Sequence, residues 1–183
     1  MRKIIVSVLG HDRPGIIATV SKVLFQNGCN IEDVSQTILQ TEFAGIFIAS
    51  HPESLKQDEL LGRLREKLDA MGLSALLREM EETGLWEPPP GEPFVITTMG
   101  PDRLGLVAGV TELLARFGVN ISNLKAVFRG GDDPRANTMI YEVDIPVTID
   151  QNLFREALRE RGMELGIDIS LQHRDIFEAI HRV

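Results

Sequence analysis

The chain has 183 residues, of which 43% are hydrophobic and 25% are charged; this balance excludes a disordered chain, a collagen-like repeat and a bundle of membrane helices. The formal net charge is −8 and no basic patch interrupts the acidic sequence, so direct binding to nucleic acid is not expected. The single cysteine, Cys29, excludes intrachain disulfides and cysteine-based zinc sites.

The first element is a short apolar strand. Residues 4–9 follow Met1-Arg2-Lys3 and end at a polar loop, without the small-residue cleavage site of a secretion signal. No apolar run approaches the ~20 residues that a membrane span needs. We therefore expect a cytoplasmic protein.

The chain then repeats itself. A shift of 90 residues superimposes residues 10–37 on residues 100–127 with ten identities in 28 positions, which indicates a duplicated unit. Three consecutive prolines, Pro88 to Pro90, predict a stiff spacer between the copies. We expect one domain at 1–86, a Pro-rich linker at 87–93, a second domain at 94–174 and a C-terminal tail at 175–183 that can form a helix.

The apolar periodicity changes in the same order in both copies. Strands at 4–9 and 94–97 precede helical stripes at 16–24 and 106–117, and Gly28 and Gly118 fit left-handed C′ positions. A second and a third strand, a second helix (residues 60–71, and 153–158 with Asp150 as N-cap) and a last strand (residues 165–171) complete each copy. The order βαββαβ, found twice, predicts an α+β fold of two tandem ferredoxin-like domains, with antiparallel sheets and helices on one face.

The loop between the first strand and the first helix carries the recurring polar residues. It reads Gly10-His11-Asp12-Arg13-Pro14-Gly15, and its counterpart reads Gly100-Pro101-Asp102-Arg103-Leu104-Gly105. A helix N-terminus suits a carboxylate, Gly15 and Gly105 allow close approach, and the Asp and Arg side chains suit an ammonium group and a carboxylate. The alternative is that each Asp caps its own helix and each Arg is solvated.

Asn30 and Asn120 recur at the start of the second strand, which we expect near the same strand end as the loop. An amide donates and accepts hydrogen bonds, as the two ends of a zwitterion require. The alternative is a turn residue that tolerates a left-handed backbone. Because loop and Asn recur together, we expect them to form one site in each copy.

Signals of catalysis are weak. The sequence has neither a GxxxxGK[ST] loop nor a GxGxxG loop, and His11, His51, His173 and His181 lack metal-ligand spacing. Cys29 becomes Val119 in the second copy, which fits a small buried hydrophobe. We expect no catalytic residue, no metal and no cofactor.

The strings DRPGI…GCNIED and DRLGL…GVNIS resemble ACT domains, which are small-molecule sensing modules of amino-acid metabolism. A tandem pair of this kind is similar to the glycine cleavage system transcriptional repressor family. The resemblance implies amino-acid binding at ACT–ACT interfaces and engagement of a protein partner rather than DNA. Carried over by position, the ligand-binding residues are Asp12, Arg13, Gly15, Asn30, Ile31, Asp102, Arg103, Gly105, Asn120 and Ile121.

These observations lead to one functional hypothesis and one alternative. The hypothesis is a non-enzymatic regulator, expected as a homodimer, in which a small amino acid such as glycine or serine controls association with a regulatory protein partner. The alternative is a regulatory subunit or detached sensor of an amino-acid or folate metabolic enzyme.

Overall fold

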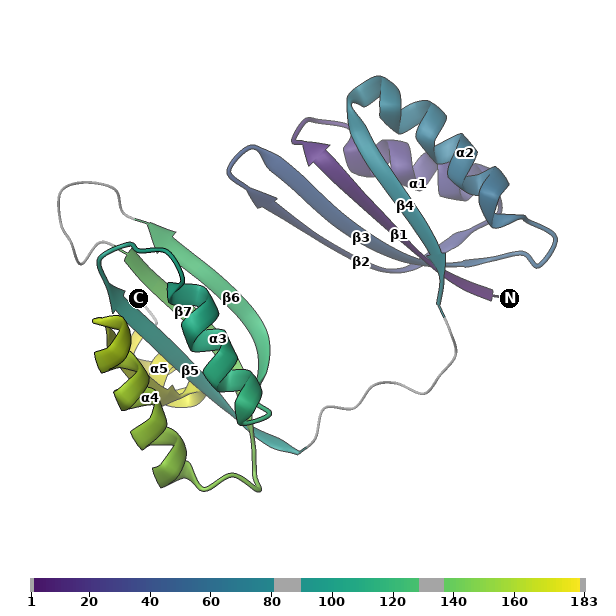
Figure 1. The fold of residues 1–183 in the computed structure, drawn as a ribbon. Coiled ribbons are helices and arrows are strands. Elements are labelled where there is room, and N and C mark those ends of the chain that lie inside the picture. Colours follow the sequence, from purple (N-terminus) through teal and green to yellow (C-terminus); the bar gives the residue numbers. More distant parts are fainter. Residues whose placement is uncertain (1, 81–89, 129–136, 182–183) are drawn as a thin grey trace. The chain divides into compact units, whose positions relative to one another are not determined.

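The chain folds into two compact units, which we call unit 1 (Met1–Leu85) and unit 2 (Trp86–Val183). The structure, a computed structural model, describes residues 2–80, 90–128 and 137–181. Each unit contains one four-stranded antiparallel sheet with two helices packed on it (Figure 1). Among the described residues, no helix combines the length and the apolar character that crossing a bilayer requires.

Unit 1 has the predicted order of elements. They are β1 (Arg2–His11), α1 (Ile16–Gln26), β2 (Asn30–Leu39), β3 (Glu42–His51), α2 (Gln57–Leu68) with a 3-10 turn (Asp69–Met71), and β4 (Leu73–Glu79). In space the strands follow the order β2-β3-β1-β4. The edges of the sheet are therefore β2 and β4.

Unit 2 repeats this order and adds one helix. Its elements are β5 (Gly91–Gly100), α3 (Leu106–Arg116), β6 (Asn120–Phe128), β7 (Asn137–Pro146), α4 (Gln151–Leu165), β8 (Asp168–His173) and α5 (Arg174–His181). The strand order β6-β7-β5-β8 matches that of unit 1. The predicted fold class, βαββαβ twice with antiparallel sheets, is confirmed, and the helices of each βαββαβ set lie on one sheet face; α5 is the addition.

The first strand of unit 2 starts inside the segment predicted as linker. Residues 87–89 of that segment lie outside the described residues, whereas residues 91–93 belong to β5. Proline lacks an N–H and cannot take part fully in a central strand. Pro93 is tolerated because it pairs with Asp144 on one side only, and pairing with β8 begins at Phe94.

The core of unit 1 lies between its sheet and the helices α1 and α2. Phe43 and Phe47 of β3 are 2% and 0% exposed, and Gly45 lies between them on the same face of the strand. A Cβ atom at Gly45 would stand 2.7 Å from the Phe43 ring, so glycine makes room for both aromatic rings. Alternation along β3 thus places every second side chain in the core.

The core of unit 2 corrects two details of the sequence prediction. Phe154 and Leu158 of α4 are buried as expected, but Leu153 is 57% exposed because it lies off the apolar stripe. Leu165 was expected in the last strand, yet it is the last residue of α4. The helix ends only at Gly166, which has the left-handed backbone (φ 59°) that favours glycine.

The tail forms α5, which packs on the opposite face of its sheet from α3 and α4 (Figure 1). Val95, which alternates with the core residues Phe94 and Ile96, is only 2% exposed on that face. Arg174 of α5 forms an ion pair with Asp144 of β7 at 3.6 Å. The chain's own C-terminal helix therefore covers the part of this face around Val95, whereas Met99, farther along β5 on the same face, is 44% exposed.

The predicted helix ends are confirmed by the backbone. Gly28 and Gly118 have φ values of 70° and 65°, as expected of left-handed C′ residues. Asp150 caps α4, because its carboxylate accepts hydrogen bonds from the amides of Asn152 (2.9 Å) and Leu153 (3.2 Å).

Replacing Asp150 with alanine is expected to lower the free energy of unfolding by about 1 kcal/mol, because two amides of the first helical turn lose their acceptor. Urea unfolding followed by circular dichroism measures the change. Asp150→Asn, which keeps a capping oxygen, serves as the control and should retain most of the stability. Equal stability of Asp150→Ala and the wild type would contradict the assigned cap.

Candidate functional site

Two equivalent hollows mark the predicted loops. In unit 1 a hollow of ≈ 230 Å³ lies beside Asp12, Arg13 and Gly15 and extends to Gln36 and Phe43. In unit 2 a hollow of ≈ 490 Å³ lies beside Asp102, Arg103 and Gly105 and extends to Ala126, Asn137 and Met139. Gln36 and Ala126 are related by the same shift of 90 residues as the loops, so the two hollows occupy corresponding places.

Each hollow reaches the exposed N-terminus of a helix. Gly15 and Gly105 are the N-cap residues of α1 and α3, with φ values of 97° and 87°, and no side chain among the described residues caps either helix. Neither helix has an acidic residue in its first turn, whereas α2 has Asp58 and Glu59 there and α4 is capped by Asp150. The first amides of α1 and α3 are thus available to an anion, which the helix dipole also favours.

The glycine at each N-cap leaves space above the helix. An added Cβ at Gly15 or Gly105 would meet nothing within 4 Å, but the left-handed backbone favours glycine at both positions. The alternative in which Asp12 or Asp102 caps its own helix is not observed, because the caps are the glycines. The aspartates remain at the rims of the hollows.

The two aspartates have different neighbours. The backbone amide of Asp12 donates to the carbonyl of Thr41 at 2.8 Å, which fixes the loop of unit 1 against the turn after β2. The carboxylate of Asp102 accepts a hydrogen bond from the Asn137 side chain at 3.2 Å. An ammonium group at Asp102 would therefore meet a carboxylate that already accepts one hydrogen bond, whereas no described side chain donates to the carboxylate of Asp12.

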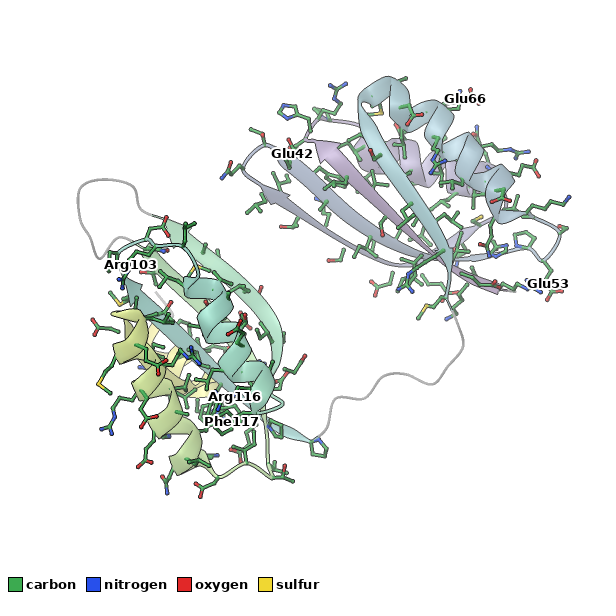
Figure 2. The ribbon with its side chains drawn as sticks, in the orientation of Figure 1. Glu42, Glu53, Glu66, Arg103, Arg116 and Phe117 are labelled. Carbon is green, nitrogen blue, oxygen red and sulfur yellow. The ribbon has the colours of Figure 1, made fainter. Side chains whose placement is uncertain are left out.

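The two arginines of the loops also differ. Arg103 turns toward the C-terminal end of α4, where its guanidinium donates to the carbonyls of Leu165 and Gly166 (Figure 2). These carbonyls are left without partners by the end of the helix, and a cation there is favoured by the helix dipole. Arg13 makes no such bond among the described residues of unit 1. Arg103 therefore stabilises the end of a helix, whereas Arg13 does not.

Replacing Arg103 with alanine is expected to lower the free energy of unfolding by about 1 kcal/mol, because the C-terminal carbonyls of α4 lose a charged donor. Arg13→Ala is the matched control and should change stability by less than about 0.5 kcal/mol. Urea unfolding of both variants makes the comparison. Equal losses in the two variants would show that Arg103 does not cap α4.

Asn30 and Asn120 do not lie beside the loops, which corrects the sequence prediction. Asn30 pairs with Ser50 of β3, and Ser50 pairs with Lys3 at the start of β1, whereas the loop follows the end of β1. At ~3.3 Å per residue, about 25 Å of sheet separates Asn30 from the loop. Asn120 has the corresponding place opposite Asp144. The cause is α1, which carries the chain back along the sheet before β2 begins.

Ile31 and Ile121, the neighbours of these asparagines, pack against the cores. Ile31 pairs with Ala49 and Ile121 with Val143, both on the helix-covered faces. Cys29 is 8% exposed, and burial raises the pKa of its thiol above the usual value, which confirms its interpretation as a small buried hydrophobe. Cys29, Ile31 and Ile121 therefore contribute to the packing of the unit in which each of them lies.

Other residues of the hollows were not found from the sequence. Gln36, Phe43, Asn137 and Met139 come from strands that face the loops only after folding. Ile17 and Val107, on the first turns of α1 and α3, are 37% and 41% exposed at the hollows. The shift of 90 residues relates Ile17 to Val107, and this is the one signal in the sequence that marks them as a pair.

Comparison with known proteins identifies the repeat. The sequence model described as the ACT domain matches residues 2–77 and 92–133. A UPF0237 protein of Methanocaldococcus jannaschii is 52% identical over 90 residues, which are 49% of this chain and 96% of the relative. A UPF0237 protein of Methanopyrus kandleri is 43% identical over 90 residues, with the same two coverages. Each of these relatives has about the length of one half of this chain.

Two solved structures match nearly the whole chain. An unknown protein from Galdieria sulphuraria is 26% identical with a TM-score of 0.73, over 94% of this chain and 98% of the other. A crystal structure described as a "putative glycine cleavage system transcriptional repressor" is 19% identical with a TM-score of 0.63, over 93% of this chain and 96% of the other. At that identity the second match shows a shared fold.

Proposed function

Because the chain belongs to the ACT domain family, we propose that it is a non-enzymatic cytoplasmic regulator. The protein binds a small amino acid, glycine or serine, at ACT interfaces. Binding of this amino acid controls the association of the protein with a partner protein. One observation carries the proposal. Both units place an acidic loop residue and an uncapped helix N-terminus at the rim of one hollow, and both do so at corresponding positions.

The two groups at each hollow match the two charges of a free amino acid. The carboxylate fits the unpaired amides at the start of α1 or α3, where the helix dipole favours negative charge. The ammonium group fits Asp12 or Asp102 at the rim. Arg13 offers a second partner for the carboxylate in unit 1, whereas Arg103 is engaged at α4. We therefore expect unit 1 to bind more tightly.

Asn30 and Asn120 enter such a site only from another ACT unit. Both begin edge strands, β2 and β6, which leave one row of backbone hydrogen-bonding groups open to pairing. Antiparallel pairing with the edge strand of another ACT unit brings the start of one strand beside the loop end of the other. The sheet that separates Asn30 from its own loop thus favours a ligand site completed across an ACT interface.

The partner protein is proposed from the fold and the charge. The matched structure described as a "putative glycine cleavage system transcriptional repressor" shares the fold of this chain, and a net charge of −8 opposes direct contact with DNA. A regulator of this charge would act through another protein. Affinity capture from cell extract, with and without glycine, distinguishes a transcription factor from a metabolic enzyme as that partner.

The test of ligand binding is a thermal-shift screen with the twenty amino acids. A ligand that binds only the folded protein stabilises it in proportion to the logarithm of its concentration. Glycine or serine is expected to raise the midpoint of unfolding at about 10 mM, which exceeds the expected dissociation constant. If no amino acid raises it, the proposed function is wrong.

A further inference from the structure

The face of the unit 1 sheet that points away from α1 and α2 is exposed and apolar. Leu9, Ile46 and Leu76, from three different strands, are 58%, 52% and 60% exposed there. With the small residues between them they line a hollow of ≈ 530 Å³. We call this surface the open face of unit 1; it consists of alternate residues in the ranges 5–9, 33–37, 44–48 and 74–78.

The corresponding face of unit 2 is partly buried by a helix of the same chain, although Met99, the counterpart of Leu9, is 44% exposed. Val95 has the place in unit 2 that Ile5 has in unit 1, and Val95 is 2% exposed under α5. The ion pair between Arg174 and Asp144 fastens that cover. Among the described residues of unit 1, no helix takes the same place (Figure 1). The apolar side chains of the open face of unit 1 are therefore not covered by a helix of that unit.

The register of the sheet sorts the open face into rows that run across the strands. One row contains Leu76, Ser7, Ile46 and Ser35, and the next contains Ser74, Leu9, Ala44 and Thr37. Both rows lack charged residues. Large and small side chains alternate along each row, so ridges lie beside hollows.

We propose that two copies of the chain form a homodimer by stacking the open faces of unit 1, with the twofold axis along the strands. This axis places each row over the same row in reverse order, so that β1 lies over β3 of the partner and β2 over β4. Large residues then face small ones across the interface: Leu9 faces Ala44, Ile46 faces Ser7, and Leu76 faces Ser35. Such interdigitation is how sheets pack face to face.

The charges at the rim favour the same axis. Arg78 on β4 and Asp33 on β2 end one row, on opposite sides of Ile5 and Ile48. With the axis along the strands, Asp33 of each copy faces Arg78 of the other, and stacked sheets ~10 Å apart leave a gap that the two side chains can span. An axis across the strands would instead place both charges over uncharged rows.

The flat area of the open face approaches the area that a stable dimer buries. Strands spaced ~4.8 Å apart and paired over residues 4–10 of β1 give about 440 Å² of flat sheet per copy. Two copies therefore bury about 900 Å² of flat sheet, without the additional surface of the protruding side chains. This area approaches the ~1,200 Å² that specific interfaces bury. The contact leaves the β2 edge free and requires no ligand, so it stands independently of the proposed function.

The first test compares two substitutions of exposed apolar residues in the full chain. Sedimentation equilibrium without any amino acid should show a dimer for the wild type. Leu76→Lys should weaken the dimer at least about 100-fold, because two lysines enter the apolar interface. Phe25→Lys, on α1 and 79% exposed, is the matched control and should remain dimeric. A monomeric wild type, or equal effects of the two substitutions, would overturn the proposal.

The second test exchanges the rim charges. Asp33→Arg and Arg78→Asp each place two like-charged pairs across the interface and should weaken the dimer about tenfold at low salt. The double variant restores opposite charges and should recover wild-type affinity. When the two single variants are mixed, heterodimers should form in preference to either homodimer. Identical affinities for all four proteins, or a random mixture, would refute the proposed axis.

Discussion

Replacing Phe47 with alanine is expected to lower the free energy of unfolding of unit 1 by about 3–5 kcal/mol, the largest change in stability that the structure predicts. Phe47 is fully buried, pairs with Val6 of β1 and packs beside Phe43 over Gly45. Its removal leaves a cavity between the sheet and both helices, which the surrounding rings fill only in part.

Hydrogen exchange measures this change in each unit separately. Amide protons of β1 and β3 should lose protection in the Phe47→Ala variant, since their slowest exchange reports opening of unit 1. Phe25→Ala is the control, because its side chain is 79% exposed and its loss should cost less than about 0.5 kcal/mol. A loss of protection spread equally over both units would contradict an independent core for unit 1.

Replacing both Asp12 and Asp102 with alanine is expected to weaken the binding of glycine or serine about 10- to 100-fold, because each site loses the acceptor of its ammonium group. The single variants separate the two units. Asp12→Ala should have the larger effect, since Asp102 is already bonded to Asn137.

Asp58→Ala controls for the loss of negative charge near a helix N-terminus, because Asp58 lies in the first turn of α2 and outside both hollows. Thermal-shift titrations of the four variants and the wild type provide the comparison. If Asp58→Ala weakens binding as much as Asp12→Ala does, the effect is one of general charge and the site assignment is wrong.

Much of the fold could be predicted from the sequence because its signals are local or periodic. The shift of 90 residues reveals the duplication, the change of apolar period separates strands from helices, and Asp150 and Gly28 mark helix ends through their own backbone chemistry. The pattern predicts a strand at Leu165, although the residue ends α4, because an apolar residue before Gly166 fits the period of the strand as well as that of the helix.

The candidate site was harder to predict because it depends on direction in space. The loops and the asparagines recur together in the sequence, but α1 and α3 carry the chain back along each sheet and separate them. The engagement of Arg103 with the end of α4 depends on a contact between residues 62 positions apart. Only a comparison of the two folded copies shows that Arg13 and Arg103 differ.

The measurement that tests the central claim most directly is a calorimetric titration of glycine and of serine into the full chain. Glycine has five heavy atoms, and at a ceiling of ~1.5 kcal/mol per atom its dissociation constant can be no tighter than about 3 µM. Desolvation of its charges should move the constant toward the millimolar range. We expect saturable heat from the wild type that the Asp12→Ala/Asp102→Ala variant loses; the absence of saturable heat, or equal heat from that variant, would contradict ligand binding at this site.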